Sequence, residues 1–434
     1  MNARTTALSA LIACRRQGAW ADGALKEYIA RDGLDSRDAA LATRLVYGVM
    51  QNRLLLDHWL DGLVKGGTAR LQPVVLDILR LGLYQIQFLD KIPPSAAVNE
   101  AVDQGKKYAN RQAAGLINGV LRSALRQRDQ LTPPADPALR YSHPQALTQL
   151  LAGEMGDALP ELLQSHNAPV PLTVQRNPLA CSEAAFLEAL RDAGVGAQRH
   201  PWCQNAWILQ GVGSVERLPL FARGWFYVQD PAARLAVTAA GLEPGMRVLD
   251  VCAAPGGKSF AAAMDLHNTG EVISCDIHPH KITLLEKGAA RLGLSCIKPR
   301  LQDGSAFVPE WERAMDAVIA DVPCSGLGVI RKKPDIRYKS LDDLARLPEL
   351  QSRILANAAR YVRPGGVLIY STCTILRREN EAVAQAFLEA HGAFEPEAIQ
   401  LPEALGEADR SMVTLYPHRH GTDGFFICKL RRRP

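Results

Sequence analysis

Apolar residues recur at helical spacing through the first 140 residues of the chain. Two such sets are Leu41, Leu45, Val46 and Val49, and Val75, Ile78, Leu79, Leu83 and Ile86. Glycine and proline interrupt the pattern at positions 33, 66–67, 93–94 and 133–134. Because this spacing is typical of amphipathic helices, residues 1–135 are predicted to form an all-helical domain. Asp35 or Ser36 is expected to cap one of its helices and Ser95 another.

The pattern becomes mixed after a proline-rich stretch at residues 131–137, which is expected to be a linker or a domain end. Helical spacing at residues 145–155 and 183–193 alternates with strand-like runs at residues 172–176 and 206–209. Residues 140–224 are therefore predicted to form a small α+β domain. A further strand is expected at residues 225–229, and Asp230 followed by Pro231 is a favourable helix start.

Short apolar runs alternate with helical patterns from residue 245 to the end. The runs lie at residues 247–251, 272–276, 296–299, 317–321, 366–371 and 425–430. Strands that alternate with helices form parallel sheets covered on both faces. Residues 225–434 are therefore predicted to be a third domain, an α/β fold with a doubly wound, Rossmann-like sheet.

The first of these runs leads into a loop that suits a ligand. Residues 248–258 read Val-Leu-Asp-Val-Cys-Ala-Ala-Pro-Gly-Gly-Lys, a strand, a tight turn and the start of an alanine-rich helix. Gly256 and Gly257 let the backbone approach a ligand, and the helix start directs free N–H groups to the same space. The loop lacks the glycine pattern of nicotinamide dinucleotide sites, and Cys252 stands where a phosphate-binding loop needs glycine. An adenosine without phosphates fits better.

Asp276 ends the second run, where an acidic residue commonly holds ribose hydroxyls. An ordinary strand-end turn explains Asp276 alone equally well. It explains the whole loop at residues 248–258 poorly.

Composition and charge narrow the class of partner. The 434 residues are 47% hydrophobic, enough for a large core, and the net charge is +5. The first 140 residues hold 19 Lys and Arg against 13 Asp and Glu, so the excess lies in the helical domain. Its basic side chains gather late, at Lys106, Lys107, Arg111, Arg122, Arg126 and Arg128. They suit a phosphate-binding face, although a solvated helix face is the commoner explanation.

The cysteines indicate the cellular compartment of the protein, and the histidines do not indicate a metal site. Nine cysteines without a C-x-x-C pair, in a chain without a recognisable signal peptide, indicate reduced thiols in the cytoplasm. No apolar run approaches the roughly 20 residues of a membrane span. The pairs His278 and His280, and His418 and His420, lack partners at metal spacing, so no metal is expected. No large apolar stripe is left over, which makes a monomer the default expectation.

Two further strand ends direct reactive side chains to the same region. One run ends in Asp321-Val-Pro-Cys324-Ser-Gly326 and another in Tyr370-Ser-Thr-Cys373-Thr. Because neighbouring parallel strands share one crevice at their carboxyl ends, Asp321, Cys324 and Cys373 are predicted to converge there. A free cysteine is often a small core residue. Two cysteines at strand ends favour covalent chemistry instead, since a thiol adds little to adenosine binding.

Methylation at carbon 5 of a pyrimidine is a reaction that needs a thiol beside a cofactor that resembles a methyl donor. A thiolate that adds to carbon 6 makes carbon 5 nucleophilic, and a carboxylic acid such as Asp321 can assist at the third ring nitrogen. A second thiol can help to remove the proton from carbon 5 and so release the first. The target base must leave its stack to reach the pocket. These arguments do not rank the two cysteines.

The motifs resemble those of the RNA cytosine-5 methyltransferases of the Nop2/Sun family. The similarity covers residues 250–258, 321–326 and 370–374 in order and spacing, and extends to Asn177-Pro-Leu and residues 329–335 and 424–426. Val251 and Val322 depart from the family, which often has another apolar residue there. Residues 44–48, 94–100 and 118–122 resemble a NusB-like RNA-binding domain. Together they imply an rRNA (cytosine-5-)-methyltransferase that acts on 16S (small-subunit) rRNA, with a middle domain that binds RNA or links its neighbours.

The resemblance also implies a cofactor, S-adenosyl-L-methionine. Its implied binding residues are Cys252, Ala253, Ala254, Pro255, Gly256, Gly257, Lys258, Asp276, Asp303 and Asp321. Asp276 is implied to hold the ribose, Asp303 to lie near the adenine, and Asp321 to contact the cytosine as well. Cys373 is implied to be the nucleophile and Cys324 to help release the product. Lys258 is open to a second interpretation, as a helix-start residue.

Three alternatives stay open. The target can be another RNA, such as a tRNA. A non-catalytic RNA-binding module is a second alternative, but it leaves the gathering of Asp321, Cys324 and Cys373 unexplained. A small-molecule methyltransferase is the third, and it would need neither the basic helical domain nor paired thiols.

Overall fold

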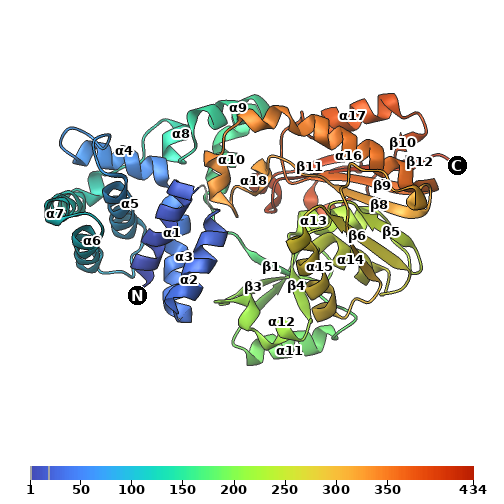
Figure 1. Cartoon of the computed structure of the whole chain (residues 1–434), viewed down its shortest axis with the longest axis horizontal. Helices are drawn as coiled ribbons and strands as arrows, with labels where there is room; N and C mark the ends of the chain where they lie inside the picture. Colours follow the sequence, from blue (N-terminus) through green and yellow to red (C-terminus); the bar gives the residue numbers. More distant parts are fainter. Residues whose placement is uncertain (1, 18–19) are drawn as a thin grey trace. The chain divides into compact units, whose positions relative to one another are not determined.

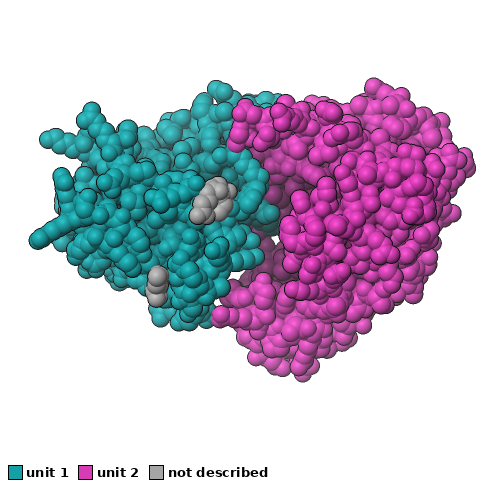
Figure 2. Space-filling view, in the orientation of Figure 1, with its two compact units in different colours: residues 1–168, 330–339 teal, residues 169–329, 340–434 magenta. Residues whose placement is uncertain are grey.

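The computed structural model describes residues 2–17 and 20–434. The chain forms two compact units, which Figure 2 shows in different colours. Unit 1 comprises Met1–Ala168 and Ile330–Lys339, and unit 2 comprises Pro169–Val329 and Ser340–Pro434. Ten residues from the middle of the second half of the sequence therefore belong to unit 1. The three domain boundaries expected from the sequence stay a prediction.

Unit 1 is helical, as predicted (Figure 1). Its main helices are α1 (Ala3–Gln17), α2 (Ala21–Asp32), α3 (Ser36–Gln51), α4 (Arg53–Leu63), α5 (Pro73–Phe88), α6 (Pro94–Tyr108) and α7 (Arg111–Arg126), followed by α8 (Pro137–Arg140), α9 (Gln145–Met155) and α10 (Leu159–Ser165). Leu45 and Val46 of α3 and Ile78 and Leu79 of α5 are fully buried in one core, at the spacing that the sequence indicated.

The two predicted helix caps have different outcomes. Asp35 caps α3, because its side chain accepts a hydrogen bond from the Asp38 N–H. The Ser95 cap is wrong, since α6 begins at Pro94 and the capping position is Pro93, whose side chain makes no cap bond. Proline has the backbone angle that a first helical turn needs, so this helix starts without a hydroxyl cap.

The segment Ile330–Lys339 is anchored in unit 1 by a buried arginine. Arg337, in the short 3-10 helix η6 (Pro334–Tyr338), is 1% exposed. Its Nη1 donates to the Gln51 carbonyl oxygen at 2.9 Å, and its Nη2 donates to the His166 carbonyl oxygen at 2.9 Å and to Asn167 Oδ1 at 2.6 Å. Burial lowers the pKa of Arg337 to about 10.

Unit 2 begins with a small antiparallel sheet. Its strands are β1 (Leu172–Arg176), β2 (Gly196–Arg199), β3 (Ala206–Gln210) and β4 (Phe226–Val228), in the order β2-β3-β1-β4, with α11 (Glu183–Asp192) and α12 (Pro219–Ala222) beside them. This is the predicted α+β element. The buried Asn177 joins it to the rest of the unit, because its Nδ2 donates to the carbonyl oxygens of Gly224 and Leu292.

The larger sheet has, in the described part of the chain, the order β10-β12-β9-β8-β5-β6-β7, with β11 paired to β12. Its strands are β5 (Arg247–Asp250), β6 (Glu271–Asp276), β7 (Ile297–Leu301), β8 (Met315–Asp321), β9 (Val362–Thr372), β10 (Phe394–Pro396), β11 (Met412–Leu415) and β12 (Phe425–Arg432). Strands β5 to β9 are parallel. The strand order reverses between β5 and β8, which is where a doubly wound sheet opens its ligand crevice.

Helices cover both faces of this sheet (Figure 1). One face packs against α13 (Pro231–Ala239), α14 (Gly257–Asp265) and α15 (Pro279–Leu292), and the other against α16 (Leu347–Tyr361) and α17 (Glu381–Ala390). Successive residues of β5 serve opposite faces, since Val248 lies in the first apolar cluster and Leu249 in the second. Asp230 caps α13, as predicted, by accepting from the Ala232 N–H.

The last strand corrects one expectation. The alternation of strands and helices predicted a parallel sheet throughout, but β12 runs antiparallel to β9, and β10 and β11 pair antiparallel with β12. Strands β11 and β12 form a hairpin joined through α18 (Pro417–His420), so β12 returns along its neighbour.

Candidate active site

The candidate site is built at the carboxyl ends of four neighbouring strands. Asp250 ends β5, Asp276 ends β6 and Asp321 ends β8, while Cys373 directly follows β9. The strand order places these ends on both sides of the switch point between β5 and β8.

The loop between β5 and α14 follows the sheet edge closely. The Ala253 N–H donates to the Cys275 carbonyl oxygen at 2.7 Å, and the Gly256 N–H donates to the Ala253 carbonyl oxygen at 2.8 Å. Gly256 has φ +114°, a backbone conformation that favours glycine. A Cβ at Gly257 would lie 3.3 Å from Gln229 Nε2. The loop is therefore a cradle that larger residues would disturb.

Asp303 lies next to this loop. A Cβ added to the following residue, Gly304, would lie 3.0 Å from the Val251 carbonyl oxygen and 3.5 Å from Cys252 Sγ. Asp303 Oδ1 accepts from both the N–H and the hydroxyl of Ser305 at 2.8 Å, which fixes the turn. Asp276 is fixed similarly, since its Oδ1 accepts from the His278 N–H at 3.0 Å.

Three strand-end carboxylates act on Cys252. Burial raises the pKa of the Cys252 thiol well above its usual value, and the negative charges of Asp250, Asp321 and Asp276 raise it further. These surroundings favour the thiol form of Cys252 over the thiolate. The same electrostatic coupling shows that these carboxylates converge around the first loop.

Asp250 is the most deeply buried of these acids. Burial raises its pKa to about 7, although a hydrogen bond from Ser259 Oγ at 2.8 Å favours the charged form. Its Oδ1 is buried without a hydrogen-bond partner in the described structure. Asp250 is not among the site residues predicted from the sequence. A carboxylate in an otherwise apolar strand was the available signal.

Lys258 is part of an ion pair and not only a helix-start residue. Its Nζ lies 2.6 Å from Asp321 Oδ2, and Asp321 Oδ1 accepts from Ser371 Oγ at 2.8 Å. Burial lowers the pKa of Lys258, but attraction to Asp321 and smaller contributions from Asp250 and Cys373 outweigh burial and raise it overall. Asp321 thus accepts hydrogen bonds as a carboxylate, and the Lys258 ammonium lies within electrostatic reach of Cys373.

The two predicted cysteines lie together. Their sulfur atoms are 3.2 Å apart, and both side chains are partly exposed. The hydrogen bond with Cys373 raises the pKa of Cys324 well above its usual value, and burial and the nearby charges of Cys373, Glu379 and Asp321 add to this. Cys324 is therefore held as a thiol beside the Cys373 sulfur.

Three chain segments cross beside Cys373. The Gly328 N–H donates to the Cys373 carbonyl oxygen at 3.0 Å, and the Gly424 N–H donates to the Gly328 carbonyl oxygen at 2.8 Å. A Cβ on Gly328 would overlap the Gly424 carbonyl group. Glycine at both positions lets the segment after Cys324 and the start of β12 approach the nucleophile loop.

A set of buried polar residues behind the cysteines was missed. The set comprises Gln351, Thr372, Thr374, Glu379 and Asn380, all of them buried. In sequence, Glu379 and Asn380 look like an ordinary polar start to α17. The partners of Glu379, Ser325 and Gln351, lie 54 and 28 residues away in the chain, so spacing alone does not reveal them.

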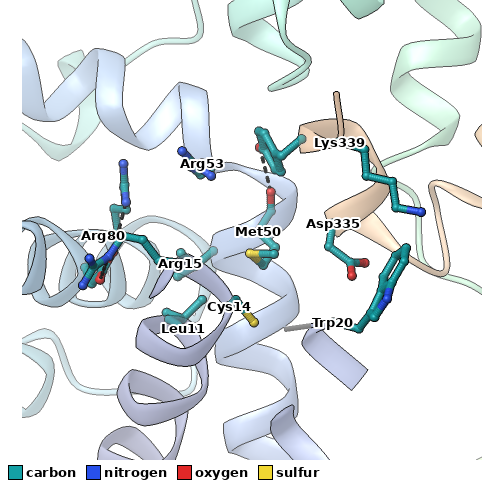
Figure 3. A pocket seen from close by; sticks show the side chains of 12 residues that line it. Leu11, Cys14, Arg15, Trp20, Met50, Arg53, Arg80, Asp335 and Lys339 are labelled. Atoms are coloured by element: carbon teal, nitrogen blue, oxygen red, sulfur yellow. Dashed lines mark hydrogen bonds and ion pairs between the residues drawn. The ribbon is translucent and has the colours of Figure 1, made fainter. Parts of the chain in front are cut away.

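Unit 1 contains a separate cavity of about 440 Å³ (Figure 3). Arg15 and Arg80, in its wall, both bind Asp77, and the Lys339 ammonium lies 3.8 Å from the centre of the Trp20 ring. The Arg15 and Arg80 charges are therefore paired with Asp77 in the cavity wall, and the Lys339 charge lies over an aromatic ring. Its lining, among the described residues, includes none of the predicted site residues.

The basic side chains predicted near the end of the helical domain lie at the surface of unit 1. The exposed ones are Lys106 and Lys107 of α6 and Arg111, Arg122 and Arg126 of α7. Arg128 is half-buried and forms an ion pair with Asp90 at 3.2 Å.

No helix in the ranges 2–17 and 20–434 has the length and apolarity that a membrane crossing requires. No three His, Cys, Asp or Glu side chains in these ranges gather as a candidate metal site.

Comparison with protein families identifies all three parts of the chain. The family described as 16S rRNA methyltransferase RsmB/F matches residues 237–431. The NusB family matches residues 1–126, and the ferredoxin-like domain of RsmF/B-like methyltransferases matches residues 143–216.

Individual relatives match the chain almost from end to end. The probable ribosomal RNA small subunit methyltransferase B of Bacillus subtilis is 37% identical over 99% of this chain and 98% of its own. The ribosomal RNA small subunit methyltransferase B of Vibrio cholerae is 32% identical over 100% and 98%. The protein in the crystal structure of PH0851 is 25% identical in sequence to this chain, and its fold matches with a TM-score of 0.81 over 98% of each chain. A methyltransferase homolog from Pyrococcus horikoshii is 26% identical with a TM-score of 0.59, over 68% of this chain and 98% of its own.

The fold and these matches define a Rossmann-like methyltransferase fused to a NusB-like helical domain. Within this class, the chain belongs to the RsmB/F family of 16S rRNA methyltransferases.

Proposed function

We propose that this protein transfers a methyl group from S-adenosyl-L-methionine to carbon 5 of a cytosine in 16S rRNA, through a covalent adduct with Cys373. The family carries the assignment of the RNA. The observation that carries the chemistry is the pair of sulfur atoms, 3.2 Å apart, on two strand-end loops beside the Lys258–Asp321 ion pair.

Cys373 is the nucleophile of this proposal. A thiolate is the reactive form, and the raised pKa of Cys324 favours the thiol form at that position, which leaves the nucleophile role to Cys373. Attack of the Cys373 thiolate on carbon 6 of the cytosine forms a carbon–sulfur bond and makes carbon 5 nucleophilic. Carbon 5 then takes the methyl group.

Cys324 is the base in the release step of this proposal. Once Cys373 is bonded to carbon 6, its hydrogen bond and its charge no longer raise the pKa of Cys324, and only burial and the nearby carboxylates still do. Cys324 can then lose its thiol proton to solvent and, as a thiolate, accept the proton on carbon 5. The carbon–sulfur bond breaks, the ring double bond returns, and Cys373 leaves as a thiolate.

The first loop and its neighbours fit the cofactor. The residues that would hold it are Cys252, Ala253, Ala254, Pro255, Gly256, Gly257 and Lys258, with Asp276, Asp303 and Asp321. The glycine cradle and the unpartnered Asp250 Oδ1 at the end of β5 support this assignment. When bound, S-adenosyl-L-methionine supplies the methyl group as an electrophile.

Asp321 is the proposed contact with the cytosine. As the partner of Lys258, its carboxylate can accept a hydrogen bond from the amino group of the base. The exposed basic residues of α6 and α7 are the proposed contacts for the RNA backbone. We place the reaction in the cytoplasm, with the protein as a monomer.

The test uses unmodified small-subunit rRNA and S-adenosyl-L-methionine labelled in its methyl group. After reaction, the RNA is digested to nucleosides and the labelled nucleoside is identified by mass. The proposal predicts label in 5-methylcytidine with the parent protein and none with Cys373→Ala. Label in another nucleoside, or equal labelling by the Cys373→Ala variant, would contradict it. Transfer to tRNA but not to rRNA would favour the alternative target.

A further inference from the structure

A buried carboxylate lies behind the loop that carries Cys324. Glu379 is fully buried, and its Oε2 accepts from the Ser325 N–H and from Gln351 Nε2, both at 2.9 Å. Gln351 Nε2 also donates to the Pro323 carbonyl oxygen at 3.0 Å. The residues on both sides of Cys324 are therefore held by Glu379, one directly and one through Gln351.

The next residue in the chain holds the other cysteine loop in the same way. Asn380 Oδ1 accepts from Thr372 Oγ1 at 2.6 Å, and Asn380 Nδ2 donates to the Thr374 carbonyl oxygen at 3.0 Å. These are the residues on both sides of Cys373. Glu379 and Asn380 are adjacent, so one dipeptide fixes the flanks of both cysteines.

Two further bonds tie this arrangement together. Ser325 Oγ donates to Thr374 Oγ1 at 2.7 Å, which joins the two cysteine loops directly. Tyr370 of β9 donates through its hydroxyl to the Glu379 carbonyl oxygen at 2.6 Å, which fixes the dipeptide to the sheet. Glu379 Oε1 and Gln351 Oε1 are buried without a hydrogen-bond partner in the described structure. The bonds that are made still hold the loops, because each bonded group would lose its partner if the loops moved apart.

We propose that Glu379 and Asn380 are positioning residues that hold the Cys324 sulfur against the Cys373 sulfur, and that product release depends on them. The inference rests on the proposed two-cysteine reaction. Neither side chain touches the reacting atoms. Adduct formation needs only the Cys373 loop and the cofactor loop, whereas release needs Cys324 at its observed distance from Cys373. Loosening the Cys324 loop should therefore leave the first half of the reaction intact and block the second.

The charge of Glu379 supports the same role. It is one of the groups that raise the pKa of Cys324. Glu379 thus favours the thiol form of Cys324 before attack, when Cys373 must be the thiolate.

The test compares adduct accumulation in five full-length variants with labelled S-adenosyl-L-methionine and small-subunit rRNA. Gln351→Leu and Glu379→Leu remove the support of Cys324. Glu379→Gln keeps an oxygen that can accept from Ser325. Asn177→Leu is the matched control, because Asn177 is also a buried side chain of unit 2 with two bonds to backbone carbonyl groups, away from the cysteines. Cys324→Ala is the reference for blocked release.

Gln351→Leu and Glu379→Leu should accumulate a labelled protein–RNA adduct like that of Cys324→Ala, with turnover reduced at least about tenfold. Glu379→Gln should restore turnover to within about threefold of the parent. Asn177→Leu should lose stability without accumulating adduct.

The inference is overturned if the two leucine variants turn over like the parent, or if adduct and turnover fall together in proportion to the folded fraction. A different outcome separates the two proposals. If Cys324→Ala itself traps no adduct, the two-cysteine reaction fails and the positioning role fails with it. If Cys324→Ala traps adduct and the leucine variants do not, only the positioning role fails.

Discussion

At the scale of single residues, the two cysteine thiols of the site are chemically identical but have different surroundings. Cys373 lies within electrostatic reach of the Lys258 ammonium, whereas Cys324 shares a hydrogen bond with Cys373 and has the buried Glu379 carboxylate behind its loop. Opposite environments for two like groups are what a nucleophile and a base need. The ion pair between Lys258 and Asp321 is therefore central, because it joins the cofactor loop to the end of β8.

Replacing Lys258 with methionine removes the ammonium and leaves Asp321 without its ion-pair partner. We expect the rate of methyl transfer to fall by about 100-fold or more, as when one preorganised charge is removed from an active site. Lys298→Met is the control, since Lys298 is exposed on β7 and its Nζ donates to the Ser295 carbonyl oxygen. Single-turnover transfer of labelled methyl measures both. A parental rate for Lys258→Met would show that the ion pair is only structural.

The use of Cys324 as the base of the release step predicts the direction of a pH effect. Below the pKa that the Cys324 thiol has in the adduct, its thiolate fraction grows tenfold for each pH unit, so release should accelerate from neutral to alkaline pH. Decay of the adduct in the parent protein, followed after a chase with unlabelled cofactor, measures this step. In Cys324→Ala the slow residual decay should lose this slope. A pH-independent decay in the parent would exclude Cys324 as the base.

At the scale of elements, the site depends on chain segments that cross without side chains between them. The Gly328 segment lies between the Cys373 loop and the Gly424 backbone at the start of β12. This crossing connects the two cysteine loops to the antiparallel edge of the sheet. It explains why a glycine precedes the two phenylalanines of β12.

Gly328→Ala should destabilise unit 2, because the added methyl group would overlap the Gly424 carbonyl group and backbone must move. We expect the free energy of unfolding to fall by about 2–4 kcal/mol, in the range of strong overpacking. Gly392→Ala is the control, since a Cβ there meets no atom within 4 Å, and it should change stability by no more than about 0.5 kcal/mol. Urea unfolding of the two variants tests this, and equal stabilities would contradict it.

The elements also show what the sequence can predict. The bounds of α9 and β1 match the predicted ranges, because each has a strong local apolar period. The edge strand β2 was missed, since its four residues are all exposed and carry no alternation. The direction of β12 was predicted wrongly, because its antiparallel pairing with β11 and β9 depends on the tertiary fold. The roles of Glu379 and Gln351 were also beyond prediction, since each depends on loops that come together only in the fold.

At the scale of the whole molecule, the chain enters unit 2, returns to unit 1 at Ile330–Lys339, and enters unit 2 again. Within unit 1, this segment packs beside the buried residue His143. His143 Nε2 lies 3.0 Å from His166 Nδ1, and burial lowers the pKa of His143 well below its usual value, with the charge of Arg337 adding to the effect. Unit 1 therefore has a buried group that resists protonation.

This arrangement predicts that acid lowers the stability of unit 1. The folded pKa of His143 is lower than its value of 6.5 in an unfolded chain, so below that pH the unfolded state binds the additional proton. The free energy of unfolding should then fall by up to about 1.4 kcal/mol for each pH unit below 6.5. His143→Gln should flatten this slope. Denaturant unfolding of unit 1 at pH 5.0 to 7.5, on the full chain, measures it. Parallel slopes in parent and variant would assign the acid sensitivity to other groups.

The central claim is that two thiols divide one reaction, with Cys373 forming the adduct and Cys324 releasing it. The most direct measurement incubates the parent, Cys373→Ala and Cys324→Ala with small-subunit rRNA and labelled S-adenosyl-L-methionine, and separates the products on a denaturing gel. The account predicts a labelled protein–RNA band for Cys324→Ala only, and neither adduct nor methyl transfer for Cys373→Ala. If both variants methylate the RNA at the parental rate, the covalent mechanism is wrong and both cysteines are packing residues.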